Sequence, residues 1–147
     1  MKSHQYLFEL KNDLSELRTL SQHLNKFGQV AGLSKAHVMD INICSEELFT
    51  NIVFYGFEDD SEHIIKFAIS LDNNMLRLQI EDDGVAFDPL YKRDAEIPSD
   101  LSEIKIGGFG IHIVKRLMDD IFYKREDGKN LKFCSNRWMI EFNGSGY

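Results

Sequence analysis

The sequence predicts an α+β fold, a two-layer α/β sandwich whose mixed, mainly antiparallel sheet is covered on one face by three helices. The prediction depends on a change of period along the chain. Apolar residues recur every three or four positions over residues 14–31 and 34–56, and again after residue 110, whereas they alternate with polar residues between positions 63 and 81. With 147 residues and 43% hydrophobic content, residues 1–147 are expected to form a single domain.

The predicted helices have recognisable start and stop signals. Residues 13–16 (DLSE) have the spacing of a capping box, which predicts a helix from about Leu14 to Ala31 that Gly32 ends. Ser34 can cap a second, longer helix that stops near Gly56. A third, short helix is expected after the next glycines, with a core face formed by Ile111, Val114, Leu117 and Met118.

Strands are predicted both before and after the third helix in the sequence. Alternation over residues 63–71 and 76–81, on either side of Asp72-Asn73-Asn74, predicts a β-hairpin. Two more strands are expected around a turn at Gly128, and residues 6–10 can add an edge strand. Residues 88–106 hold both prolines and many charges with little periodicity, which predicts a mobile lid that extends over about residues 88–109.

Composition and charge exclude several classes of function. A balance of 17 basic against 24 acidic residues argues against a nucleic-acid partner held by phosphate contacts. The N-terminus lacks the regions of a signal peptide, and no apolar run approaches the ~20 residues of a membrane span, so we expect a cytoplasmic protein with no membrane association. Cys44 and Cys134 are too few for a disulfide framework or a four-ligand zinc site and are expected to be buried and reduced.

The first of three polar segments is SEELFTN, residues 45–51 of the second predicted helix. Glu47 and Asn51 stand one turn apart, so their side chains share one face of the helix. The Asn51 oxygen could bind a divalent cation such as magnesium, and Glu47 could accept a proton as a general base. The structural alternative makes Asn51 a buried amide bonded to the backbone and Glu47 an ion-pair partner.

The second segment is EDDGVAFDP, residues 81–89, at the end of the hairpin. Asp-Gly is a common turn, and it can be no more than that here. Alternatively, Asp82 accepts a hydrogen bond from an exocyclic amine while Gly84 lets a flat base approach the main chain, a combination that would select adenine over guanine. Phe87 could wall such a pocket or could serve only in packing.

The third segment is IGGFGIHIV, residues 106–114. Gly107, Gly108, Phe109 and Gly110 directly precede the helix that contains Ile111, so main-chain amides and the helix N-terminus could bind phosphate oxygens. The alternative is a hinge with no ligand. Lys105 is a candidate phosphate cation that could equally be solvated. Taken together, the three segments indicate a nucleotide-binding site.

With these segments in this order, the chain resembles the stand-alone ATPase domains of the GHKL superfamily, which share the Bergerat ATP-binding fold, and looks most like the bacterial anti-sigma-factor serine/threonine kinases. SEELFTN is similar to the family's N box, and EDDGVAFDP and IGGFGIHIVKRLMD to its two glycine boxes. The resemblance implies that Glu47 is the catalytic base, Asn51 the magnesium ligand and Asp82 the adenine-reading carboxylate. It also implies nucleotide contacts from Gly84, Gly107, Gly108 and Gly110.

The resemblance further implies a function. Such kinases use ATP and Mg²⁺ to phosphorylate a serine or threonine of a small anti-sigma-factor antagonist, and they also bind a sigma factor. Homodimers occur in the family, and the N-terminal strand and first helix are where we would expect one. A regulatory module that sequesters a sigma factor or another partner without transferring phosphate is the alternative, and a detached catalytic domain of a histidine kinase is a third option.

The chain departs from the family pattern at three places. Tyr55 stands where many relatives have histidine. The final predicted strands contain no Gly-Thr pair where the family often supplies a threonine to the adenine pocket, and the lid lacks a threonine-rich stretch. These departures concern the affinity for ATP and the closing of the lid more than they concern the fold.

Overall fold

A computed structural model describes residues 3–86 and 110–137 of the chain. Phe87, Lys105, Gly107, Gly108, Phe109 and the predicted lid at 88–109 lie outside the described residues, as do residues 138–142 of the last predicted strand. The strands are β1 (His4–Lys11), β2 (Ile64–Asp72), β3 (Met75–Asp82), β4 (Asp120–Glu126) and β5 (Lys129–Arg137). The helices are α1 (Leu17–Ala31), preceded by a short 3-10 turn at Leu14–Glu16, α2 (Lys35–Tyr55) and α3 (Gly110–Leu117).

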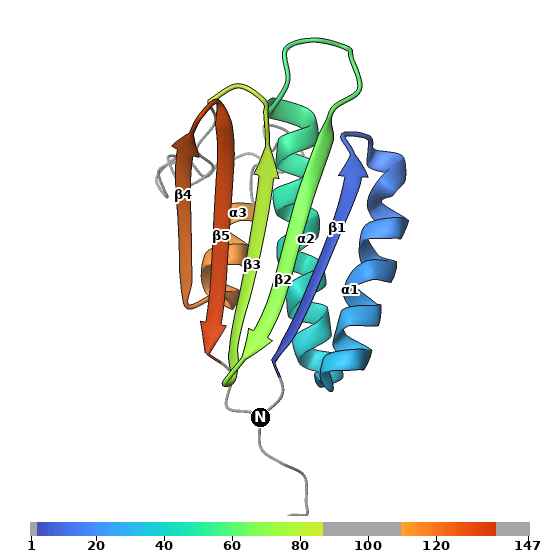
Figure 1. Ribbon diagram of the computed structural model, residues 1–147, viewed down its shortest axis with the longest axis vertical. Coiled ribbons are helices and arrows are strands. Elements are labelled where there is room, and N and C mark those ends of the chain that lie inside the picture. The colour runs from blue at the N-terminus through green and yellow to red at the C-terminus, as the bar shows by residue number, and fades with distance from the viewer. Residues whose placement is uncertain (1–2, 87–109, 138–147) are drawn as a thin grey trace, which may run out of the picture.

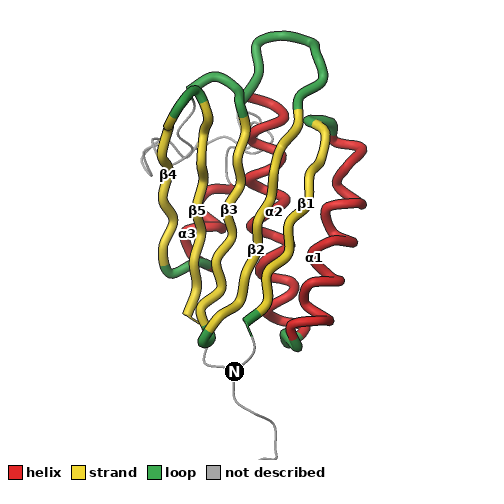
Figure 2. The backbone as a smooth tube through the Cα atoms, in the orientation of Figure 1, coloured by secondary structure: helices red, strands yellow, loops and turns green. Residues whose placement is uncertain are grey.

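The strands form one sheet in the order β1-β2-β3-β5-β4, and the helices cover one of its faces (Figure 1; Figure 2). This arrangement confirms the predicted two-layer α+β fold and the edge position of β1. All four neighbouring strand pairs are antiparallel, so the described part of the sheet has no parallel pair where we expected a mixed sheet. The connection through α3 places β5, rather than β4, beside β3, which brings residues 130–137 next to residues 75–82.

The ends of the helices follow from local chemistry. Ser34 Oγ accepts a hydrogen bond from His37 N at 3.1 Å and so caps α2, as predicted. Gly32 ends α1 with a φ of 75°, a conformation that favours glycine. The predicted capping box is wrong in detail, because Asp13 Oδ1 accepts from Ser15 N at 2.9 Å and Glu16 accepts from Lys11 N at 3.0 Å. A 3-10 turn therefore precedes the first helix.

The two tight hairpin turns also follow from residue type. Asn73 and Asn74 have φ values of 51° and 63°, and Asp127 and Gly128 have 51° and 75°. A two-residue turn with positive φ at both positions matches the twist of antiparallel strands, and asparagine, aspartate and glycine tolerate it best. These turns fix the register in which Asp72 pairs with Met75, so the apolar face of the hairpin points toward the helices.

The hydrophobic core lies between the sheet and the helices. Phe8 stacks on Phe67 with ring centroids 4.7 Å apart, and Ile111 and Val114 bring α3 into the same cluster. Cys44 of α2 and Cys134 of β5 are both free and buried, as predicted. Burial raises the pKa of each thiol to about 12. Among the described helices, none combines the length and the apolar character that crossing a bilayer requires.

Candidate nucleotide-binding site

Glu47 and Asn51 lie one turn apart on α2, as predicted. Asn51 is 3% exposed, and within residues 3–86 and 110–137 its carboxamide forms no hydrogen bond with another group. Glu47 is half-buried and forms no ion pair within the same residues. The described residues thus give no support to the structural alternative, in which the backbone holds Asn51 and a cation holds Glu47. An amide oxygen that accepts no hydrogen bond from the protein is suited to a hard cation.

The carboxyl group of Glu47 has a shifted pKa. Its pKa is raised from the ordinary value, first because burial penalises the charged form and second because the carboxylate of Glu46 is nearby. A general base works best when its pKa approaches the operating pH. The shift is therefore in the direction that the proposed role of Glu47 needs.

Asp82 ends β3 and is 2% exposed. Its Oδ1 atom accepts a hydrogen bond from Gly84 N at 2.9 Å, which closes the Asp82–Gly84 turn. The turn is fixed to the C-terminal end of α2, because Val85 N donates to Gly56 O at 2.7 Å. A β-carbon on Gly84 would lie 2.0 Å from Gly56 O, so contact with α2 alone already requires a glycine here. Asp82 is thereby held at the end of the helix that carries Asn51.

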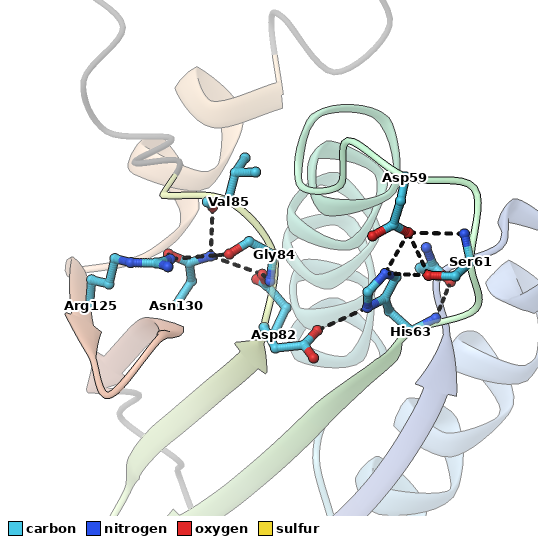
Figure 3. Close-up of polar contacts among 10 residues, drawn as sticks. Asp59, Ser61, His63, Asp82, Gly84, Val85, Arg125 and Asn130 are labelled. Atoms are coloured by element: carbon cyan, nitrogen blue, oxygen red, sulfur yellow. Dashed lines mark hydrogen bonds and ion pairs between the residues drawn. The ribbon is translucent and has the colours of Figure 1, made fainter.

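Strand β5 supplies two side chains to Asp82 that the sequence analysis missed (Figure 3 shows Asn130). Asn130 Nδ2 donates to Asp82 Oδ1 at 3.0 Å and to Val85 O at 2.8 Å. Lys132 Nζ lies 3.1 Å from Asp82 Oδ2, and both side chains of this ion pair are buried. One signal in the sequence could have revealed them. The polar residues 130, 132 and 136 stand an even number of positions apart in one strand, which places their side chains together on its inward face.

Asn130 is itself held by strand β4. Its Oδ1 atom accepts a hydrogen bond from Tyr123 Oη at 2.6 Å. It also accepts one from Arg125 Nη1 at 2.9 Å, and the same Arg125 atom donates to Gly84 O at 3.1 Å (Figure 3). Each polar atom of the Asn130 carboxamide thus has partners, which fixes its orientation. This network positions the Asp82 turn from the side opposite α2.

A second polar cluster, Asp59, Ser61, His63 and Asp83, joins the loop after α2 to the same turn. Figure 3 shows Asp59, Ser61 and His63. His63 Nε2 lies 2.8 Å from Asp59 Oδ1, and its Nδ1 lies 3.2 Å from Asp83 Oδ1. The hydrogen bond to Asp59 and the charges of Asp59 and Asp83 outweigh partial burial and raise the pKa of His63. His63 also stacks on Phe57 at 4.1 Å. The sequence analysis did not single out this cluster.

Helix α3 begins at Gly110 and packs against α2. The Ile111 side chain is 1% exposed and belongs to the core cluster, so a contact from this residue to a ligand would have to come from its main chain. The structure therefore brings Asp82, Gly84 and the end of α2 together. The expected phosphate-binding residues that precede α3, Lys105 and Gly107 to Phe109, are outside the described part of the chain.

The helix-covered sheet and the carboxylate turn fixed to the end of α2 agree with the architecture of a GHKL-type domain. A family model described as "Histidine kinase-like ATPase domain" matches residues 10–134. The chain therefore belongs to the histidine kinase-like ATPase domain family.

Curated relatives are named as kinases. The chain is 30% identical to the serine-protein kinase RsbW of Bacillus cereus over 120 residues, which cover 78% of this chain and 74% of that protein. It is 34% identical to RsbW of Listeria monocytogenes, with coverage of 67% and 65%, and 27% identical to the serine/threonine-protein kinase BtrW of Bordetella bronchiseptica, with coverage of 61% and 63%. The chain thus spans less than two thirds of the Listeria and Bordetella relatives.

Solved structures share the fold at low identity. The RsbU and RsbW domains of a Mycobacterium tuberculosis protein align with a TM-score of 0.64 at 15% identity, over 91% of this chain and 32% of that one. The histidine kinase domain of a blue-light activated kinase from Erythrobacter litoralis aligns with a TM-score of 0.53 at 16% identity, over 80% of this chain and 60% of that one. Both matches agree with the two-layer architecture.

Proposed function

We propose that this chain is an ATP- and Mg²⁺-dependent protein serine/threonine kinase that acts as an anti-sigma factor and phosphorylates a small anti-sigma-factor antagonist. The observation that carries the proposal is the pair on α2: a desolvated carboxylate, Glu47, one turn from a buried carboxamide, Asn51, that has no hydrogen bond within the described residues. The similarity to RsbW and BtrW kinases supports the same reaction.

In the proposed reaction, Glu47 accepts the proton of a hydroxyl group on the antagonist. The hydroxyl oxygen then forms a bond to the γ-phosphorus of ATP, the bond from that phosphorus to the β,γ-bridging oxygen breaks, and ADP leaves with the electron pair. The catalytic demand on the protein is mainly positioning and charge compensation, which a small set of residues can supply. Bound Mg²⁺ would neutralise phosphate charge, and the Asn51 oxygen is the described group best suited to hold it.

The remaining roles follow the proposed position of the nucleotide. Asp82 would accept a hydrogen bond from the 6-amine of adenine, with Gly84 beside the base. Phe87, Lys105, Gly107, Gly108, Phe109, Gly110 and Ile111 would complete the site, with residues 88–109 as its lid. A sigma factor and the antagonist would be the protein partners in the cytoplasm, and a second copy would contact β1 and α1.

The test is transfer of labelled phosphate from ATP to a candidate antagonist in the presence of Mg²⁺. The Glu47→Gln variant should lose transfer while it still binds ATP, because the substitution removes the base and keeps the shape. Glu46→Gln is the matched control, since it neutralises the neighbouring half-buried carboxylate and should keep transfer. If the wild-type chain binds ATP and its antagonist without labelling it, the regulatory binding module is the correct function.

A further inference from the structure

His63 lies between two carboxylates. Its Nε2 atom lies 2.8 Å from Asp59 Oδ1 in the loop after α2, and its Nδ1 atom lies 3.2 Å from Asp83 Oδ1 in the turn after β3. An ionised carboxylate only accepts hydrogen bonds, so each contact needs an N–H on the ring. A neutral imidazole has one N–H, whereas an imidazolium has two. Both contacts therefore form together only while His63 is protonated.

The hydroxyl group of Ser61 decides which contact a neutral ring keeps. Ser61 Oγ donates to Asp59 Oδ1 at 2.6 Å, so its proton does not point at the Nε2 atom of His63, which lies 3.1 Å away (Figure 3). Without a proton, Nε2 would face the lone pairs of the Ser61 and Asp59 oxygen atoms. The neutral ring therefore keeps its proton on Nε2, and its Nδ1 atom meets Asp83 without one.

Asp83 connects the ring to the proposed nucleotide site. It is the middle residue of the Asp82–Gly84 turn, which carries the carboxylate proposed to read adenine. This turn is joined to the end of α2 by the hydrogen bond from Val85 N to Gly56 O. The bond from His63 to Asp83 is a second link between the turn and the segment that follows α2. Its loss gives the turn more freedom, so Asp82 is held less firmly.

His63 itself is held independently of the turn. Its ring stacks on Phe57 with centroids 4.1 Å apart, and its main-chain N and O atoms both bond to Asn12 at the end of β1. Among the described residues, the charged groups that face the ring are Asp59 and Asp83. The hydrogen bond to Asp59 is the main cause that raises the pKa of His63, partial burial opposes it, and Asp83 adds to the increase. These neighbours thus favour the protonated form.

We infer that His63 is a positioning residue of the proposed nucleotide site: its doubly protonated ring holds the Asp82–Gly84 turn in the shape that binds ATP, and this hold is lost as the pH rises. The inference rests on the proposed function, and in it His63 acts on the nucleotide through Asp83. Because the carboxylates of Asp59 and Asp83 are 59% and 60% exposed, the lost contact is weak, and we expect an effect of about two- to five-fold on affinity.

The test is calorimetric titration of the chain with Mg·ATP between about pH 5.5 and 8.5, the range over which a histidine changes charge. The folded-state pKa of His63 is raised, so the affinity should be highest below pH 6.5 and should fall about two- to five-fold as the pH rises through that pKa. By linkage, saturating Mg·ATP should raise the pKa of His63 in an NMR titration of the ring. A histidine with a merely structural role would give neither result.

Two variants isolate the hydrogen bond to the turn. His63→Gln should bind ATP without this dependence on pH, because its side chain does not titrate. Asp83→Asn should bind as wild type does at low pH and should keep that affinity at high pH, since an amide can accept from a protonated Nδ1 and donate to a bare one. His23→Gln is the matched control: it removes a half-buried histidine of α1 and should keep the wild-type dependence. The titration of ATP itself is common to all these proteins and cancels in the comparison.

The outcomes distinguish the inference from the function on which it rests. If the wild-type chain binds ATP with the same dependence on pH as His63→Gln, His63 does not position the turn and the inference is wrong, whereas the proposed ATP site stands. If the wild-type chain binds no ATP at any pH, the proposed function fails and the inference fails with it. Should His63→Gln not fold, the comparison of wild type with Asp83→Asn decides, and equal pH profiles for these two would overturn the inference.

Discussion

The contact between the Asp82 turn and α2 can be tested by giving Gly84 a β-carbon. In Gly84→Ala this atom would lie 2.0 Å from Gly56 O and 3.0 Å from Asp82 Oδ1. Both are too close, and Gly56 O is main chain, so the turn has to move away from the helix. The movement breaks the 2.7 Å hydrogen bond from Val85 N to Gly56 O and weakens the 2.9 Å bond from Gly84 N to Asp82.

The cost follows from these contacts. The broken hydrogen bond contributes about 1 kcal/mol, and relief of a buried overlap costs about 1–3 kcal/mol, so we expect the free energy of unfolding to fall by about 2–4 kcal/mol. For a chain of this size the melting temperature should fall by roughly 4–16 °C. Affinity for ATP should fall as well, because Asp82 moves with the turn.

Urea unfolding monitored by circular dichroism measures this effect. Gly32→Ala is the control: its φ of 75° disfavours alanine by about 1–2 kcal/mol, but nothing lies within 4 Å of the added atom. Gly84→Ala should therefore be at least as destabilising as the control and should alone affect nucleotide binding. A free energy of unfolding within about 0.5 kcal/mol of wild type for Gly84→Ala would refute the argument.

Three further predictions concern other parts of the structure. Because the pKa of His63 is raised, the stability that its charged form contributes should be complete below pH 6.5 and should be lost as the pH rises through the folded-state pKa. In a series of unfolding measurements, the free energy of unfolding of His63→Gln should therefore depend less on pH above 6.5 than that of the wild type does. Calorimetry can compare the affinity for ATP with and without Mg²⁺. The increase that Mg²⁺ gives should be absent in Asn51→Ala and should persist in Asn42→Ala, a variant on the same helix. Cys44 and Cys134, buried with pKa values of about 12, should react with a thiol reagent only after denaturation.

Local signals in the sequence predicted most of the elements correctly. Ser34 and Gly32 mark helix ends because their chemistry satisfies main-chain groups or allows a positive φ, whatever the rest of the fold does. Asn73 and Asn74 fix the β2–β3 hairpin for the same kind of reason. The start of α1 was less predictable, since Glu16 N donates to the main-chain oxygen of Asp13 and the Asp13 side chain accepts from Ser15 N instead.

Long-range contacts were harder to predict. The order of β5 and β4 in the sheet depends on the path of the chain through α3, which no local pattern encodes. The contacts of Lys132 and Asn130 with Asp82 join residues about fifty positions apart, and the pairing of β3 with β5 alone brings them together. Asp82 was found because it belongs to a short motif, whereas its partners have no motif of their own.

The central claim is that a purine nucleotide binds where Asp82 meets the end of α2, and calorimetric titration of the chain with Mg·ATP tests it most directly. The account predicts saturable binding that Asp82→Asn weakens about ten-fold or more, while Asp83→Asn, which neutralises the exposed neighbouring carboxylate, binds as wild type does. No heat of binding to the folded wild-type chain, or equal affinities for wild type and Asp82→Asn, would contradict it.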